Sequence, residues 1–267
     1  MDQLPGRENL HYLKKWFTAF TKTTDSDDDA LCRNFDIKRE HTRRVTGEIM
    51  SLGTRLGLTE EELILAEIIA LLHDTGRFEQ YRKYNTFSDA KSENHAELGI
   101  RIIEKHNLLK DISPEAARLI IGAIRYHNRP LLPAEEAGSC LFWSRLIRDA
   151  DKLDILRVIT SYYHRTDEEQ NVALELELPD TTGISDAVYN SLMRQEIVNI
   201  RDVRNLNDIK LLQAGWVYDI NFLPALEEIK NRNYTGLLRS ALPAMPEVDE
   251  IFDAVETFMD KRLLSQK

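Results

Sequence analysis

The segment from Glu60 to His73 constrains the fold of this chain more than any other. It follows Thr59, and Thr59 and Glu62 occupy the two positions of a capping box, which satisfies free backbone N–H groups at a helix start. A helix that is apolar on nearly every side must be buried in a core. The sequence therefore predicts a buried helix that ends at the adjacent pair His73-Asp74. Its apolar residues are Leu63, Ile64, Leu65, Ile68, Ile69, Leu71 and Leu72.

Helical periodicity extends over most of the chain, and no region alternates strands with helices, which argues against a doubly wound sheet. We therefore expect an all-α fold. Clear apolar stripes and capping signals predict helices over residues 8–22, 37–56, 94–107, 114–127 and 140–160. Weaker signals predict helices over 185–198, 204–231 and 246–264.

Residues 76–94 and 167–184 are among the segments without a helical pattern, which are predicted to be irregular. Residues 76–94 are polar and aromatic, and we expect a loop whose aromatic side chains form a lid or wall: Phe78, Tyr81, Tyr84 and Phe87. Residues 167–184 favour turns, and the alternation of apolar and charged residues from Val172 allows short strands.

Composition limits where the protein acts and what it binds. The two cysteines, Cys32 and Cys140, fit neither a disulfide framework nor a zinc knuckle, which favours a reducing compartment. The start MDQLPGRENL has no basic segment before an apolar one, and no apolar run approaches a membrane span, so we expect a cytoplasmic protein with no membrane contact. The formal charge of −10 argues against general nucleic-acid binding.

Six potential metal ligands follow one another in the order H, HD, H, H, D. A lone buried histidine is more often a hydrogen-bonded core residue, but each of these lies at a core-facing position or an end of a predicted helix. A buried aspartate is costly without a partner, and a metal ion supplies one. The series therefore predicts a two-metal centre, the kind of site that catalyses phosphoester chemistry. Its members are His41, His73, Asp74, His95, His127 and Asp151.

The ordered motifs around these ligands resemble those of the HD-domain superfamily of metal-dependent phosphohydrolases. The matching segments begin at His41 (His-Thr-Arg-Arg-Val), Leu71 (Leu-Leu-His-Asp-Thr-Gly-Arg), Asn94 (Asn-His-Ala-Glu-Leu-Gly), Arg125 (Arg-Tyr-His-Asn) and Arg148 (Arg-Asp-Ala-Asp-Lys-Leu-Asp). The resemblance covers residues 37–160, about half of the chain. It implies a helical bundle with a metal centre in the middle and additional C-terminal helices.

With this resemblance, three segments are expected along the chain. Residues 1–30 would form an N-terminal helix and an acidic linker, and residues 31–165 the HD metal-binding core. Residues 166–267 would form a C-terminal helical extension that packs on the core, shapes the substrate pocket or makes an oligomer contact. Homo-oligomerisation is left open.

The resemblance also implies a distribution of ligands over one or two divalent ions, Mn, Fe, Ni, Co, Mg or Zn. The first ion would be held by His41, His73, Asp74 and Asp151. Asp74 would bridge to a second ion, which His95 and His127 would complete. Asn128 differs from the second histidine found here in the subfamilies that cleave cyclic dinucleotides, which argues against that activity and its third metal.

The expected reaction is hydrolysis of a phosphoester or phosphoanhydride bond in a small nucleotide-like molecule by a metal-activated hydroxide. We expect Asp74, Arg77 and Lys152 to be catalytic. Cationic side chains would bind the phosphate, although each could equally be a surface charge or a structural ion pair. They are Arg44, Arg77, Arg125, Arg129 and Lys152.

Two other functions stay open on the ligand set alone. The same ligand order resembles that of the HD-fold mixed-valent di-iron oxygenases. A regulatory module without catalysis is the third candidate, and the presence of all six ligands argues against it.

Overall fold

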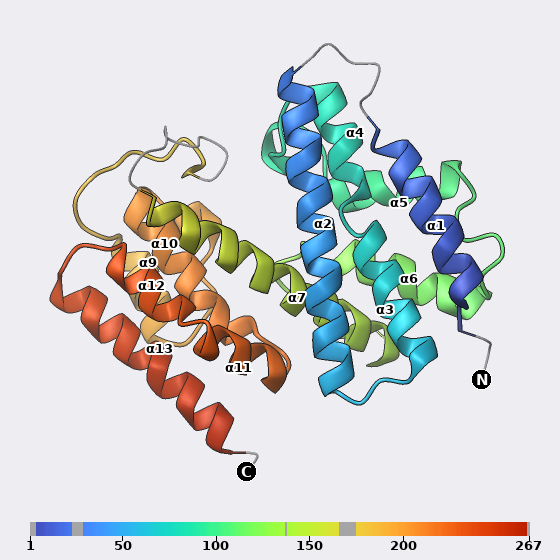
Figure 1. Ribbon diagram of the computed structural model, residues 1–267. Coiled ribbons are helices and arrows are strands. Elements are labelled where there is room, and N and C mark those ends of the chain that lie inside the picture. Colours follow the sequence, from blue (N-terminus) through green and yellow to red (C-terminus); the bar gives the residue numbers. More distant parts are fainter. Residues whose placement is uncertain (1–3, 23–28, 137, 166–174, 266–267) are drawn as a thin grey trace. The chain divides into compact units, whose positions relative to one another are not determined.

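The computed structural model describes residues 4–22, 29–136, 138–165 and 175–265, and within them all regular structure is helical (Figure 1). The predicted all-α class is confirmed. The expected strands near Val172 fall partly outside the described residues, and residues 175–184 form none. The acidic linker also lies almost wholly outside them. None of the described helices is both long and apolar enough to span a bilayer.

The chain divides into two compact units, residues 1–151 and 152–267. The first unit contains the predicted N-terminal helix as well as most of the expected metal-binding core. In it α3 contacts α1, α2 and α6, and Figure 1 shows α1 and α2 on either side of α3. Its helices are α1 (Arg7–Phe20), α2 (Asp29–Arg55), α3 (Glu60–Leu72), α4 (Thr75–Tyr84), the short 3-10 helix η1 (Asp89–Lys91), α5 (His95–Lys105), α6 (Pro114–Tyr126) and the first part of α7 (Gly138–Tyr163).

Helix α3 is buried as its sequence predicts. Leu65, Ile69 and Leu72 are fully buried. The capping box is formed, because Glu62 N donates to Thr59 Oγ1 at 3.3 Å and Thr59 N donates to a Glu62 carboxylate oxygen at 2.8 Å. The cap and the apolar surface together fix where α3 begins and how it enters the core.

The prediction of a loop over 76–94 is wrong in its first half, where α4 forms. Phe78 is fully buried and packs edge-on against Phe35, with ring centroids 4.9 Å apart. Burial of this side chain stabilises a helix in a segment whose polar composition predicts a loop. Phe78 is therefore a core residue and no lid, whereas a lid or wall role for Tyr81, Tyr84 and Phe87 stays a prediction. Asn85 ends α4 in a left-handed conformation with φ 52°.

Helices α4 and α5 approach each other at two glycines. A Cβ placed on Gly76 would clash with the carbonyl oxygen of His95 and would lie 2.7 Å from the backbone nitrogen of Gly99. Only glycine at position 76 allows this contact between the two backbones. The contact joins the start of α4, directly after His73-Asp74, to the start of α5.

All regular structure among the described residues of the second unit is helical. The predicted helix over 204–231 is divided, because Pro224 starts a new helix and residues 220–222 are extended or irregular. Helix α13 contacts α9, α11 and α12. The elements of the unit after α7 are α9 (Asp186–Met193), η2 (Ile200–Asp202), α10 (Leu206–Ala214), η3 (Gly215–Asp219), α11 (Leu223–Asn231), α12 (Tyr234–Ser240) and α13 (Pro246–Leu264). Packing of residues 166–267 on the core stays a prediction.

Replacement of Gly76 by alanine is expected to destabilise the protein. The added methyl group meets rigid backbone atoms of α5, and overpacking of this kind costs about 1–3 kcal/mol. Gly47→Ala is the matched control, because a Cβ there meets no atom within 4 Å and alanine in a helix is favoured by about 0.5–1 kcal/mol. Denaturant unfolding measures the free energy of unfolding of both variants. Equal stabilisation by the two substitutions would contradict the close approach of the backbones at Gly76.

Candidate metal centre

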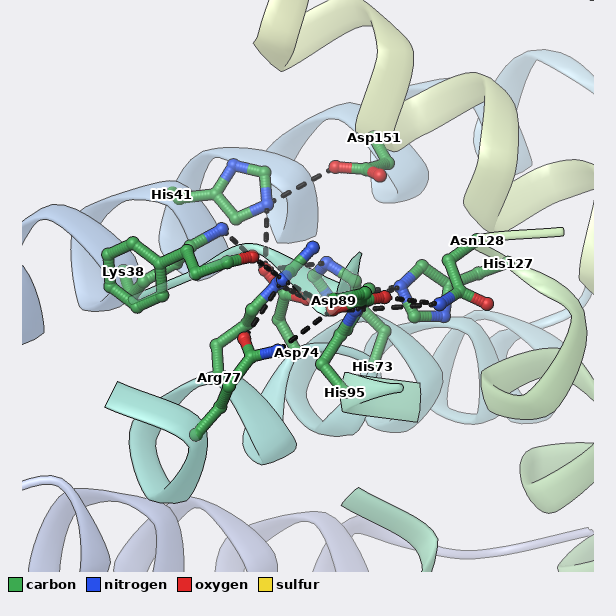
Figure 2. A network of polar contacts seen from close by, with 12 residues as sticks. Lys38, His41, His73, Asp74, Arg77, Asp89, His95, His127, Asn128 and Asp151 are labelled. Carbon is green, nitrogen blue, oxygen red and sulfur yellow. Dashed lines mark hydrogen bonds and ion pairs between the residues drawn. The ribbon is translucent and has the colours of Figure 1, made fainter. Parts of the chain in front are cut away.

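The six predicted metal ligands lie together in the first unit (Figure 2). Helix ends supply most of them, since the last turns of α3 and α6 and the first turn of α5 point to one place. Inward-facing side chains of α2 and α7 complete the cluster. His41 comes from α2, His73 and Asp74 follow α3, His95 begins α5, His127 follows α6 and Asp151 lies on α7.

The Asp74 carboxylate lies in the middle of the four imidazoles. Its Oδ2 atom is 3.4 Å from His41 Nε2 and 3.9 Å from His73 Nε2. Its Oδ1 atom is 3.4 Å from His95 Nε2 and 3.8 Å from His127 Nε2. Each carboxylate oxygen therefore faces its own pair of histidines, and His41 Nε2 also lies 3.2 Å from an oxygen of Asp151.

Backbone carbonyl groups fix the orientation of two of these rings. His73 Nδ1 lies 2.7 Å from the carbonyl oxygen of Ala70, and His127 Nδ1 lies 2.7 Å from that of Ile124. Because a carbonyl oxygen only accepts, each Nδ1 carries the hydrogen and each Nε2 presents a lone pair. His73 Nε2 is buried and has no hydrogen-bond partner among the residues that the structure describes. A cation in front of it would satisfy that lone pair.

The Nε2 atoms of His95 and His127 are only 3.0 Å apart. Asp89 Oδ2 lies 2.7 Å from His95 Nδ1, so this ring also donates from Nδ1 and presents a lone pair at Nε2. Two lone pairs at this distance need a shared positive charge. A proton is disfavoured there, because burial lowers the pKa of His95 and lowers that of His127 to about 3. A metal ion bound by both nitrogens fits the arrangement.

Both aspartates of the cluster stay ionised, although Asp74 is buried and Asp151 is only partly exposed. Burial alone would raise the pKa of Asp74, but the ammonium of Lys38 and the guanidinium of Arg77 hold that pKa well below its ordinary value. Lys38 Nζ lies 2.9 Å from Asp74 Oδ2. The pKa of Asp151 is lowered in the same way, since the neighbouring His41 outweighs the effect of burial. Ionised carboxylates and neutral imidazoles are the forms that bind metal ions.

The donor atoms are close enough to one another to share an ion. Ligand atoms of His41, His73 and Asp151 all lie within 4.8 Å of one another, and so do those of His73, Asp74 and His127. Nitrogen and oxygen donors of this kind suit Mn, Fe, Ni, Co or Zn. These buried groups could therefore hold a divalent metal.

Residues 39–156 match the family model of the HD domain. This chain contains an HD domain and is a member of the HD-domain superfamily. All six predicted ligands fall within the matched residues. HD domains are helical, bind divalent metals and generally act as metal-dependent hydrolases. No curated protein and no solved structure was found to match the chain.

Among the predicted phosphate-binding cations, Arg77 lies beside the ligands of the HD domain. Its Nε is buried 3.7 Å from Asp74 Oδ1. Its Nη1 donates to Asp89 Oδ1 at 2.9 Å and to the carbonyl of Phe87, so this end of the guanidinium is already used within the protein. Arg77 thus contributes positive charge to the cluster from a fixed position.

The other predicted cations make contacts of their own. Arg44 Nη1 lies 3.5 Å from a carboxylate oxygen of Glu40, and the Nε atom of Arg125 lies 3.3 Å from one of Glu97. Arg129 lies over the ring of Tyr126, with its guanidinium carbon 4.9 Å from the ring centroid. In the second unit, Lys152 Nζ donates to the carbonyl of Asp219 at 3.0 Å and pairs with its carboxylate. Their roles toward phosphate stay predictions.

Three residues of the site were missed by the sequence analysis. Lys38 lies one helical turn before His41 on α2, so this spacing in the sequence could have identified Lys38 as a residue of the site. Arg148 is buried and donates to the carbonyl of His127 at 3.2 Å, which fixes the end of α6; it lies in the matched motif three residues before Asp151. Asp89 has no comparable signal, because a folded loop brings it to His95.

Replacement of Asp74 by asparagine is expected to remove most bound metal. Both oxygens of the present carboxylate face histidine nitrogens, and a neutral amide supplies one weak oxygen donor. Metal content per chain is measured by mass spectrometry after reconstitution with Mn²⁺ or Co²⁺. Asp111→Asn is the control, since that carboxylate is exposed. Unchanged metal content in the Asp74 variant would contradict the centre.

The metal-free protein is expected to lose stability as the pH falls below about 6.5. The pKa values of His73, His95 and His127 are lowered in the folded state, so the unfolded chain binds more protons below that pH. Each such histidine adds a slope of up to about 1.4 kcal/mol per pH unit. Denaturant unfolding in the presence of a metal chelator, at pH 7.5 and at pH 5.5, measures this change in the free energy of unfolding. His127→Gln should reduce the pH dependence, and an unchanged dependence would argue against its buried neutral ring.

Proposed function

We propose that this chain is a metal-dependent phosphohydrolase that cleaves a phosphoester or phosphoanhydride bond of a small, nucleotide-like substrate. The observation that carries the proposal is the central carboxylate of Asp74, each of whose oxygens faces a separate pair of histidine nitrogens. A carboxylate shared in this way is suited to bridging two ions, and paired ions suit the displacement of phosphate esters.

In the proposed centre Asp74 would be a ligand of both ions. Three other residues would bind the first ion, and two others would bind the second. The Oδ2 side of Asp74 would serve the first ion and the Oδ1 side the second. Bound ions supply a water of lowered pKa and polarise the phosphoryl oxygens. The ligands of the first ion would be His41, His73 and Asp151, and those of the second His95 and His127.

The chain itself contributes charge and orientation to the reaction. Lys38 lies against Asp74 Oδ2, and Arg77 lies near Oδ1, so a cation lies on each side of the carboxylate. Once ions neutralise Asp74, these cations are placed to attract phosphoryl oxygens. Arg44, Arg125, Arg129 and Lys152 are further proposed phosphate contacts.

The proposed setting is a reducing compartment such as the cytoplasm. Cys32 and Cys140 fit no disulfide framework in the sequence, which favours this setting. The net charge of −10 makes a small phosphorylated molecule a better substrate than a nucleic acid, because bound cations reverse the field only locally. Assembly into a homo-oligomer is compatible with this function.

A phosphate-release assay tests the function. The wild type, reconstituted with Mn²⁺ or Co²⁺, is expected to release phosphate from at least one member of a panel of nucleotides, sugar phosphates and phosphodiesters coupled to a phosphatase. Asp74→Asn should lower kcat/KM by at least about 10³-fold, because the ions contribute several kcal/mol to the transition state. Asp111→Asn should keep wild-type turnover.

Two other results would overturn the proposed reaction. Oxygen consumption by the Fe-reconstituted protein, with a mixed-valent Fe(II)/Fe(III) resonance and no phosphate release, would indicate a di-iron oxygenase. Failure of the wild type to bind any metal would indicate a regulatory module instead.

A further inference from the structure

Asp89 lies beside the cluster and is not one of the six proposed ligands. Its carboxylate contacts several of the surrounding side chains. Asp89 begins η1, in the segment between α4 and α5. Its Oδ1 and Oδ2 atoms lie 2.9 Å and 2.7 Å from His95 Nδ1. His127 lies at the other nitrogen of this ring, with its Nε2 atom 3.0 Å from His95 Nε2.

Three further side chains fix the position of the Asp89 carboxylate. Arg77 Nη1 and Gln80 Nε2 each donate to Oδ1 at 2.9 Å. Asn128 Nδ2 donates to Oδ2 at 3.2 Å. Gln80 is fully buried, and it also donates to the hydroxyl of Ser92. The carboxylate is thus bound by donors from α4 and from the end of α6, which leaves it little freedom to rotate.

The need for Asp89 follows from where His95 lies on its helix. His73 and His127 each follow the last turn of a helix and donate from Nδ1 to the carbonyl three residues earlier. His95 is the first residue of α5, so no preceding helical turn offers such a carbonyl. A side chain must take its place, and the Asp89 carboxylate lies there.

We infer that Asp89 is a positioning residue that sets the second ion position by keeping the hydrogen of His95 on Nδ1 and its lone pair on Nε2. A carboxylate behind a metal-bound histidine also raises the basicity of the ring. Asp89 itself touches neither ion nor substrate. The inference rests on the two-ion centre proposed above.

Titration of the metal-free protein with Co²⁺, followed by visible absorbance and calorimetry, tests the role of Asp89. The wild type is expected to bind two ions in two steps. Asp89→Asn should weaken one step by about 10–100-fold and leave the other within about 2-fold, because His95 is the one proposed ligand that loses its charged partner. Nitrogen-15 spectra of the metal-free variant should show His95 no longer confined to one tautomer, whereas His73 and His127 are unchanged.

Asn94→Ala is the matched structural control. Asn94 accepts from Glu97 N at 3.1 Å as the N-cap of α5, so its loss destabilises the same helix by about 1 kcal/mol while Asp89 stays in place. Equal weakening of a Co²⁺ step by both variants would overturn the inference, and so would two unchanged steps in Asp89→Asn. A wild type that binds one ion or none would overturn the two-ion centre, and this inference with it.

Discussion

Burial of one carboxylate, that of Asp74, is the constraint on which the site depends. The side chain is almost inaccessible to water, directly after the most apolar of the described helices. A buried negative charge is unstable unless positive or donating groups surround it. The cations Lys38 and Arg77 lie beside it in the present structure, and four imidazoles face its oxygens. The end of α3, the start of α5 and the end of α6 meet at this carboxylate.

Much of the fold and of the ligand set could be predicted from the sequence, because both follow local rules. Apolar stripes and caps predict helices, and α3 and α13 agree with their predicted limits within one residue. The six proposed ligands lie on those stripes or at helix ends, so placing the helices also places the ligands. The prediction failed at α4, where a single buried aromatic residue, Phe78, outweighs a polar local sequence.

Residues that support the proposed ligands, such as Asp89 and Arg148, could not be found in this way. Their contacts leave no periodic pattern in the sequence. Asp89 reaches His95 through a loop whose path depends on Gln80 and Arg77. Binding of phosphate by Arg77 stays a prediction, and no pattern in the sequence indicates the hydrogen bond from its guanidinium to Asp89. Arg148 fixes the end of α6 from another helix. Such contacts depend on the tertiary structure, whereas ligand spacing is visible in the chain.

The close approach of α4 and α5 at Gly76 has a consequence for metal choice. With no side chains between the two backbones, the start of α5 cannot move closer to the end of α3, and the spacing between Asp74 and His95 is set by main-chain geometry. In the proposed centre, an ion of larger or smaller radius would then be accommodated on the opposite side, by His41 and by the partly exposed Asp151. Of the two proposed ion positions, the one next to α2 and α7 should be the less selective.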